Sequence, residues 1–384
     1  MQLQITTVAA LLACTAVMAL LALWSALSRK GRSEDEARAY LAGVTYVLSG
    51  DPDAAIAELS KAAQLNRQTL ETYFALGALF RRKGELDRAI RLHANMLLRP
   101  GLSAHVRRRA QVALAVDYKR SSLRDKAAET LEKLLAEEPD DREGLVCYRQ
   151  VCEEQGDWQK AASLQRRWVA LEAGKGEDIL AHLLAAEARR LCPADPVGAV
   201  AAATQAVRAH DASADAQWAM AETLVAAGDP GRAAAPLRRA MELEPEIAPR
   251  LVNALCLAEP NPAERERLLV EQISKRGPEG APLELALALV HKRQGAIDRA
   301  IAVLRGLVER EGQFFEARRE LGALLLAQNR SEELRADYMK ILGTLGQPTT
   351  AFACQVCDQK LPEHAFRCPS CENWDSIRRE RSLI

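Results

Sequence analysis

A short motif recurs along the middle of the chain at a nearly constant interval. Each copy has a glycine and then, after four further residues, an alanine, as in "SGDPDAAIAEL" from Ser49 and "KGELDRAIRLH" from Lys83. Several successive alanines are 34 residues apart, and a fixed interval of this length indicates a chain built from repeated structural units. The alanines are Ala55, Ala89, Ala127, Ala161, Ala199, Ala233 and Ala300, with Ser122 replacing the glycine before Ala127.

An interval of 34 residues is that of the helix-turn-helix unit of tetratricopeptide repeats. Aromatic residues make up only 4% of the chain and charged residues 27%, which favours helix over sheet. One helix pair cannot bury its own apolar face, so stacked pairs must share a continuous core. We therefore predict an all-α tetratricopeptide-repeat superhelix over residues 37–346, in preference to an unrelated helical bundle.

Glycines and prolines support this reading of the repeats. Gly43, Gly77 and Gly322 are expected where two helices approach closely. Pro139 and Pro245 each follow a repeated alanine by twelve residues, where the second helix of a unit should end. The least regular stretch runs from Pro260 to Gly280, where we expect a degenerate unit.

The first residues have a different character. Thr6 to Leu27 carries no charged residue, and about 20 apolar residues are enough for a helix to span a bilayer. A cleaved signal peptide would have a basic leading segment, which "MQLQI" lacks. We predict an uncleaved single-pass anchor at residues 1–28 and a linker at 29–36. Because Arg29, Lys30 and Arg32 follow the apolar run, the remaining chain is expected on the cytoplasmic side of the membrane.

The chain ends in a cysteine cluster, "CQVCDQKLPEHAFRCPSC". Two Cys-x-x-Cys pairs can direct four thiolates at one tetrahedral ion, so we predict a rubredoxin-like metal module at residues 347–384. The ligands would be Cys354, Cys357, Cys368 and Cys371. A four-thiolate site accepts zinc or iron, and the sequence does not choose between them. A closed site that folds a small module is a simpler account than redox catalysis, because no βαβ pattern surrounds the cysteines.

Other residues of the module have expected roles. Asp358 stands where a glycine often follows the first cysteine pair, and Asp tolerates the left-handed conformation better than most residues. We expect His364 at the surface, and Phe366 and Trp374 packed against the metal site.

Four further cysteines lie scattered through the helical pattern. They are expected to be buried and without a disulfide or catalytic role. These are Cys147, Cys152, Cys192 and Cys256.

Basic pairs end the predicted first helix in three repeats, bordering the concave face. They could hold an acidic peptide, but complementing the helix dipole is the simpler explanation, and we favour it. The pairs are Arg81–Arg82, which we expect to be exposed, Lys119–Arg120 and Lys292–Arg293. Tyr40 and Trp218 are predicted at concave positions as candidate partner anchors.

The remaining sequence excludes several classes of function. The formal net charge of zero argues against a broad nucleic-acid footprint. There is no Walker loop, dinucleotide fingerprint, His-Glu-x-x-His or nucleophile elbow. We therefore expect no enzymatic activity.

The order of anchor, repeats and four-cysteine module resembles the lipopolysaccharide assembly protein B family of Gram-negative bacteria. The most specific segments are "YLAGVTYVLSGDPDAAI" from Tyr40, "LGALFRRKGELDRAIRLH" from Leu76 and "CPSCENWDSI" from Cys368, and Trp374 also fits the family pattern. The resemblance implies an inner-membrane adaptor that brings the lipid A-committing deacetylase to a membrane-bound ATP-dependent metalloprotease, and so limits lipopolysaccharide synthesis. It also implies a metal module that packs against the repeats.

Two alternatives to this function stay open. One is a scaffold that gathers envelope or lipopolysaccharide biosynthesis enzymes without proteolysis. The other, more remote, is a redox protein whose iron is held by the four thiolates.

Overall fold

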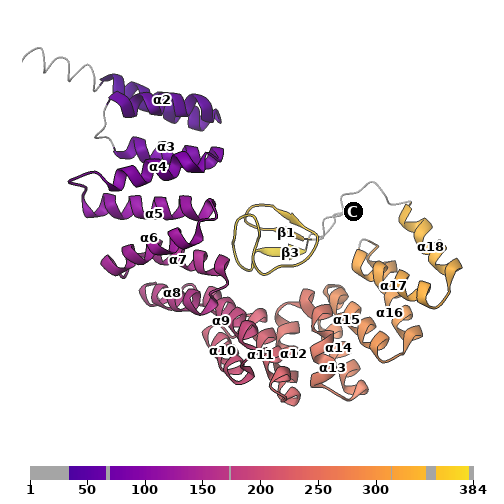
Figure 1. Cartoon of the computed structure of the whole chain (residues 1–384). Coiled ribbons are helices and arrows are strands. Elements are labelled where there is room, and N and C mark those ends of the chain that lie inside the picture. Colours follow the sequence, from indigo (N-terminus) through magenta and orange to yellow (C-terminus); the bar gives the residue numbers. More distant parts are fainter. Residues whose placement is uncertain (1–33, 66–69, 173, 313, 343–351, 380–384) are drawn as a thin grey trace, which may run out of the picture. The chain divides into compact units, whose positions relative to one another are not determined.

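The structure, a computed structural model, describes the chain except for residues 1–33, 66–69, 173, 313, 343–351 and 380–384. Helices follow one another along most of the described chain (Figure 1). They form two compact units, Met1–Asp157 and Trp158–Ile384, which are described separately. None of the helices in the described part is long and apolar enough to cross a membrane, and the predicted anchor lies outside that part.

The first unit begins with helical residues 34–49, so the helix already includes residues 34–36 of the predicted linker. From α2 onward, each helix of this unit packs against the next along the chain. Its helices are α2 (Pro52–Leu65), α3 (Leu70–Lys83), α4 (Leu86–Leu97), α5 (Ala104–Arg120), α6 (Arg124–Glu137) and α7 (Arg142–Gln155).

The second unit continues with helices and ends in the cysteine module. Its elements before the module are α8 (Trp158–Leu171), α9 (Glu177–Leu191), α10 (Pro196–Ala209), α11 (Ala214–Ala226), η1 (Pro230–Ala233), α12 (Ala234–Leu243), η2 (Pro245–Ile247), α13 (Ala248–Ala258), α14 (Pro262–Arg276), η3 (Gly277–Gly280), α15 (Ala281–Arg293), α16 (Ile297–Arg310), α17 (Phe315–Ala327) and α18 (Ser331–Leu342). One apolar cluster runs through α11 to α15 and a second through α15 to α17, as expected for stacked repeats.

The repeated alanines lie in the cores of the two units. All seven have a solvent exposure of 0%, from Ala55 in α2 to Ala300 in α16. A larger side chain at these positions would push neighbouring helices apart, because protein interiors are close-packed. The repeat predicted from the sequence is therefore a repeat of helix contacts.

The turns inside the helix pairs explain the repeated glycine. Gly84 has a φ of 83°, and the next residue's N–H, on Glu85, donates to the carbonyl of Phe80 in a Schellman-type closure. Glycine adopts this left-handed conformation without strain. Ser122 takes the same place with a φ of 59°, and the N–H of Leu123 donates to Tyr118.

The predicted close contacts hold for two of the three glycines. A methyl group on Gly43 would come 2.6 Å from Leu59 Cγ, and one on Gly77 would overlap the ring of His93. At Gly322 it would make an ordinary 3.5 Å contact with Leu334, so that position does not require glycine.

The stretch from Pro260 to Gly280 is more regular than its sequence suggests. It forms α14, whose first turn is capped by the Asn261 side chain accepting from the N–H of Ala263. The preceding turn contains no left-handed glycine, which is why the repeated motif is absent there. Pro139 and Pro245 follow the ends of α6 and α12 by two residues, as predicted.

The module is a small three-stranded antiparallel sheet in the order β2-β1-β3, with β1 (Phe352–Cys354), β2 (Lys360–Leu361) and β3 (Ile377–Arg379). Its core consists of Phe352, Cys354, Cys368 and Ile377. With so few apolar residues, the sheet depends on other interactions for its stability.

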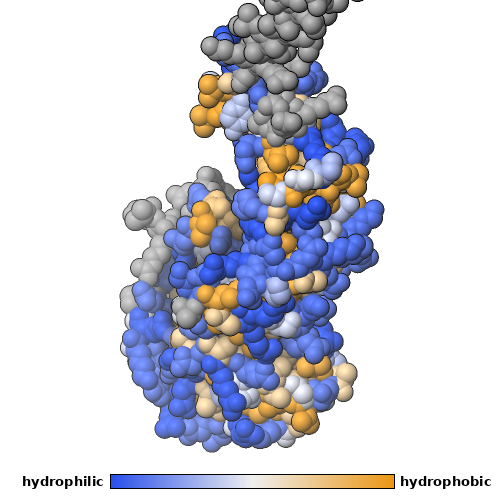
Figure 2. Space-filling model, turned by 90° about the vertical axis from the view of Figure 1, so that its left-hand side faces the viewer, coloured by the Kyte–Doolittle hydropathy of each residue, from blue (hydrophilic) through white to orange (hydrophobic). Residues whose placement is uncertain are grey.

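The surface gives little indication of a large apolar binding face. In the view of Figure 2, hydrophobic residues are interspersed among hydrophilic ones. Exposed leucines such as Leu48 and Leu98 are of the kind that occurs singly on ordinary protein surfaces.

Candidate metal centre and its docking surface

The four predicted cysteine ligands lie together at one end of the small sheet. Their sulfur atoms all lie within 4.8 Å of one another. The Cys354–Cys371 sulfur distance is 3.6 Å and the Cys357–Cys368 distance is 3.7 Å. A tetrahedral ion with metal–sulfur bonds of about 2.3 Å separates its sulfurs by about 3.8 Å, so the arrangement fits a zinc or iron ion.

The two cysteine pairs share one backbone geometry. The N–H of Asp358 donates to the Cys354 carbonyl, and the N–H of Glu372 donates to the Cys368 carbonyl, each at 2.9 Å. Asp358 has a φ of 57° and Glu372 a φ of 60°, both left-handed. Each turn thereby directs its two sulfurs to the same point, and Asp358 adopts the conformation that was expected of it.

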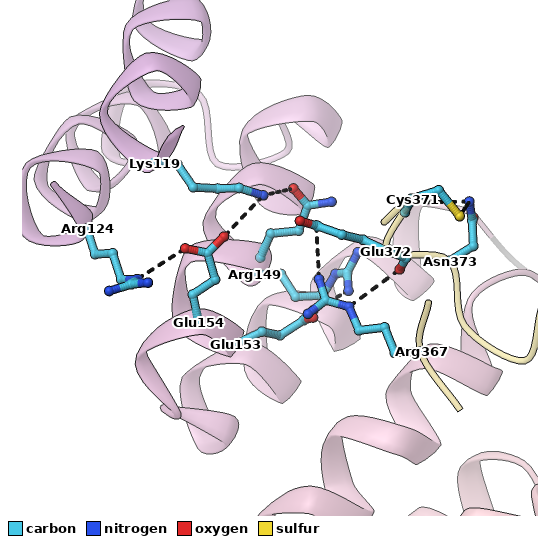
Figure 3. A network of polar contacts seen from close by, with 10 residues as sticks. Lys119, Arg124, Arg149, Glu153, Glu154, Arg367, Cys371, Glu372 and Asn373 are labelled. Atoms are coloured by element: carbon cyan, nitrogen blue, oxygen red, sulfur yellow. Dashed lines mark hydrogen bonds and ion pairs between the residues drawn. The ribbon is translucent and has the colours of Figure 1, made fainter. Parts of the chain in front are cut away.

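Hydrogen bonds to sulfur favour the thiolate form that binds metal. Cys354 Sγ and the Ser376 hydroxyl are hydrogen-bonded at 3.2 Å, and this contact is the main cause that lowers the pKa of Cys354 to about 6. The side-chain amide of Asn373 donates to Cys371 Sγ at 3.4 Å and lowers the pKa of that thiol (Figure 3). In the same loop, Arg367 forms an ion pair with Glu372 at 3.0 Å (Figure 3).

The second cysteine pair leads directly into a docking surface on the repeats. The Trp374 ring stacks on His182 of α9, with centroids 4.5 Å apart and planes 14° apart. His182 Nε2 lies 2.9 Å from Asp375 Oδ2, while its Nδ1 lies 2.8 Å from Asp215 Oδ2 of α11. His182 therefore joins the module to two repeat helices.

These contacts keep the His182 ring charged. Burial alone would lower the pKa of His182, but the hydrogen bonds to Asp215 and Asp375 outweigh it and raise the pKa to about 9. Arg189 also contacts Asp215, at 2.8 Å, and lowers the pKa of that buried carboxyl. At neutral pH, the ring is an imidazolium that donates from both nitrogens.

Trp218 of α11 lies beside the module and is only 9% exposed. Its ring is 6.5 Å from that of Phe366, and the guanidinium groups of Arg189 and Arg250 lie 5.1 Å and 4.6 Å from its centroid. The sequence predicted Trp218 as an anchor for a partner. In this structure it contacts the chain's own module.

A second part of the interface is electrostatic. Arg378 pairs with Glu244 at 3.6 Å, and Arg379 pairs with Glu311 at 3.1 Å and lies over the ring of Phe314. Burial raises the pKa of nearby Glu246 to about 7, and the neighbouring carboxylates contribute to the shift. The basic end of β3 thus meets an acidic group on the repeats.

Three aromatic residues of the module lie differently from their expected places. His364, expected at the surface, is half-buried between Phe352 and Phe366, and burial lowers its pKa to about 4. Phe366 and Trp374, expected to pack against the metal site, contact His182 of the repeats instead. They are part of the docking surface.

The first member of each predicted basic pair is bound to an acid of a later helix. Arg81 lies 3.3 Å from buried Asp117, Lys119 lies 3.6 Å from Glu154, and Lys292 lies 2.8 Å from Glu320. Figure 3 shows Lys119 and Arg124 converging on Glu154. The expected exposure is therefore wrong for Arg81, whose side chain is only 17% exposed.

The other predicted partner-binding residues differ in exposure. The second members of the basic pairs, Arg82, Arg120 and Arg293, are exposed. Tyr40 is half-buried and packs against the first repeat's core. A role in partner binding stays a prediction for all of these residues.

None of the four scattered cysteines forms a disulfide within the described chain. Cys147 and Cys152 are buried, and burial raises the pKa of Cys147 to about 11. Cys192 and Cys256 are half-buried rather than buried. A thiol with a raised pKa is a poor nucleophile, which argues against catalysis by Cys147.

Sequence reasoning missed His182, Asp215 and Asp375. A single histidine inside a helix carries no signature of its partners, and the two docked segments are 193 residues apart. The family resemblance implied that the module packs against the repeats, but it did not indicate these three residues.

Comparison with known proteins agrees with the repeat fold. Tetratricopeptide-repeat family models match residues 38–69, 72–101, 112–177 and 285–341. Lipopolysaccharide assembly protein B of Escherichia coli strain K12 is 26% identical over 367 residues, covering 93% of this chain and 94% of its own. The protein of the same name from Haemophilus influenzae is 24% identical, covering 89% of both chains.

A tetratricopeptide repeat protein from Parabacteroides merdae is among the similar solved structures. It is 14% identical and covers 76% of this chain and 99% of its own, with a TM-score of 0.39. A likeness at this level carries no argument about function. The resemblance to lipopolysaccharide assembly protein B, which extends along nearly the whole chain, is confirmed.

Proposed function

Because the chain is a nearly full-length relative of the proteins named lipopolysaccharide assembly protein B, we propose that it is a non-enzymatic adaptor in the regulation of lipopolysaccharide synthesis. Tetratricopeptide arrays present extended surfaces to other proteins. The neutral chain and the absence of catalytic motifs from its sequence support binding rather than chemistry.

The observation that carries the proposal is the docking of the module on His182 and Trp218. Four protein thiolates leave no open coordination position, as in structural rather than catalytic zinc sites. A bound ion would supply folding energy to the module. Cys354, Cys357, Cys368 and Cys371 would hold it, and the folded loop would then present Phe366, Trp374 and Asp375 to the repeats.

The more detailed proposal concerns partners and place. The adaptor brings the lipid A-committing deacetylase to a membrane-bound ATP-dependent metalloprotease, which degrades it. The uncharged run from Thr6 to Leu27 anchors the chain in the inner membrane, with the repeats on the cytoplasmic side. Tethering raises the effective concentration of the adaptor near a membrane-bound protease.

Depletion of the protein tests this proposal. The half-life of the deacetylase should lengthen after depletion and return to normal when the full chain is restored. A chain lacking residues 1–28 should restore it poorly, because the tether is lost. An unchanged half-life, together with recovery of biosynthetic enzymes bound to the chain, would favour the scaffold without proteolysis.

A further inference from the structure

A shallow groove on the first unit combines arginines with aromatic rings. It has a volume of about 440 Å³ and is lined mainly by α3 and α4. Three arginines line it, and no acidic residue does. This local excess of positive charge stands out in a chain whose formal net charge is zero.

The arginines lie along one side of α4 and just beyond its end. Arg88 and Arg91 are three residues apart, so they project from neighbouring turns of α4, and Arg99 lines the same groove from two residues beyond the helix. The Arg88 guanidinium lies 4.1 Å from the centroid of the Phe80 ring, and that of Arg99 lies 4.2 Å from the centroid of Tyr73. Stacking of this kind fixes the orientation of a guanidinium.

Arg91 differs from its neighbours. It is exposed, and the structure shows no ion pair for it within the described chain. Arg88 pairs with Glu85, which also lies 3.1 Å from Lys83, and Lys83 pairs in addition with Asp53. Arg91 therefore contributes a positive charge to the groove that has no counter-charge within the described chain, unlike Arg81, which Asp117 compensates.

The floor of the groove is apolar. Leu76 is buried and Leu92 is half-buried, and the Tyr73 and Phe80 rings form the walls. An anion alone would use the arginines but leave this floor exposed to water. A ligand that carries both carboxylates and a large apolar side chain would use both, since Arg binds carboxylates with two parallel hydrogen bonds.

We propose that this groove binds an acidic segment of a partner protein, in which Asp or Glu residues flank a large apolar residue. Arg88, Arg91 and Arg99 hold the carboxylates, and the apolar side chain lies on Leu76 and Leu92. The inference rests on the proposed adaptor function and specifies the chemistry of one partner segment. A volume of about 440 Å³ accommodates a few side chains, which suits a peptide better than a nucleic-acid duplex.

A displayed library of random peptides, selected on the purified full chain, provides the test. Selected peptides should be enriched in Asp and Glu beside Leu or Phe. Synthetic copies should bind the Arg91→Glu variant at least roughly tenfold more weakly, an effect that shrinks at high salt. The matched control is Arg38→Glu, the same charge change at an exposed arginine outside the groove. It should bind like the parent chain.

Arg91 is exposed, so its replacement should leave the helical circular dichroism unchanged. Selected peptides without acidic enrichment, or peptides that bind Arg91→Glu as well as the parent, would overturn the proposal. So would Arg91-dependent binding to vesicles of anionic phospholipid with no binding to any peptide. The proposed adaptor function is tested by a different measurement, the half-life of the deacetylase after depletion of the chain. The two proposals can therefore fail independently.

Discussion

His182 Nε2 lies 2.9 Å from the Asp375 carboxylate, although the two residues are 193 positions apart in the chain. Asp375 is four residues beyond the last cysteine ligand, Cys371. The loop that completes the metal site is therefore also the loop that reaches the repeats. This relationship connects metal binding to the shape of the repeat surface.

Replacing His182 with Gln should loosen the module without unfolding the repeats. The variant loses the charge that faces Asp215 and Asp375, and disrupting a buried charged pair costs about 3 kcal/mol. Hydrogen exchange of the amides in β1 and β3 should accelerate, while that of α15 and α16 should not. His210→Gln, at the end of α10, is the control and should leave exchange in the module unchanged. Unaltered exchange in His182→Gln would show that the docking does not depend on this contact.

The stability of the docked module should fall as pH rises from neutral to alkaline. The pKa of His182 is raised to about 9 in the folded state, so its contribution is complete below its ordinary pKa of about 6.5 and is lost as pH passes through 9. The pKa of Glu246 is also raised, to about 7, so the stability that this residue contributes is likewise lost as pH rises, over a lower pH range. Because metal binding by thiols strengthens with pH, the useful quantity is the difference in melting temperature between the parent and His182→Gln. That difference in melting temperature should shrink between pH 7 and pH 10. A constant difference would contradict a raised pKa for His182.

Ser122→Gly should stabilise the first unit. Ser122 has a φ of 59°, and the left-handed conformation costs a residue with a side chain roughly 1 kcal/mol relative to glycine. Thermal unfolding should shift upward by a few degrees. Ser121→Gly is the matched control, because Ser121 has a φ of −83° and gains nothing from glycine. Equal shifts for both variants would show that strain at Ser122 is not the cause.

Arg81 and Arg82 should respond differently to reversal of charge. Arg81→Glu places a carboxylate beside buried Asp117 and should destabilise the first unit by about 3 kcal/mol or more. Arg82→Glu, at an exposed position, should leave thermal unfolding unchanged within about 0.5 kcal/mol. If the basic pairs hold an acidic partner, only Arg82→Glu weakens binding in a fully folded protein. Equal stability of the two variants would contradict the structural role of Arg81.

The sequence predicts those parts of the molecule that follow a local rule. Ala55 and Ala300 mark helix contacts because only a small residue fits there, and the cysteine spacing constrains the sulfur positions because each turn is short. The His182–Asp375 contact follows no local rule, since it depends on how a distant loop packs on α9. For the same reason the sequence does not predict that Trp218, a candidate partner anchor, contacts Phe366 of the module.

The exposure of charged residues is also beyond what the sequence can predict. Arg81 and Arg91 are both arginines of the second repeat, yet the first pairs with an acid of α5 and the second does not. Their difference depends on Asp117, which is contributed by the next repeat. Only the packed structure shows which cations have their counter-charge within the chain.

In the proposed function, a metal-folded module that is docked on the repeats is needed for the activity of the adaptor. Replacing Cys368 and Cys371 with Ser removes two of the four thiolates, and a module with so little core should not stay folded without its ion. Helical circular dichroism should barely change, because solenoid stability comes from neighbouring repeats. Metal content should fall from about one ion per chain to none.

The most direct measurement is the half-life of the lipid A-committing deacetylase in cells whose only copy of the chain carries Cys368→Ser and Cys371→Ser. Cys192→Ser, at a half-buried cysteine outside the cluster, serves as the control and should keep the normal half-life. Our account predicts that the double variant lengthens the half-life as much as depletion does. A normal half-life in cells that contain the metal-free double variant would contradict it.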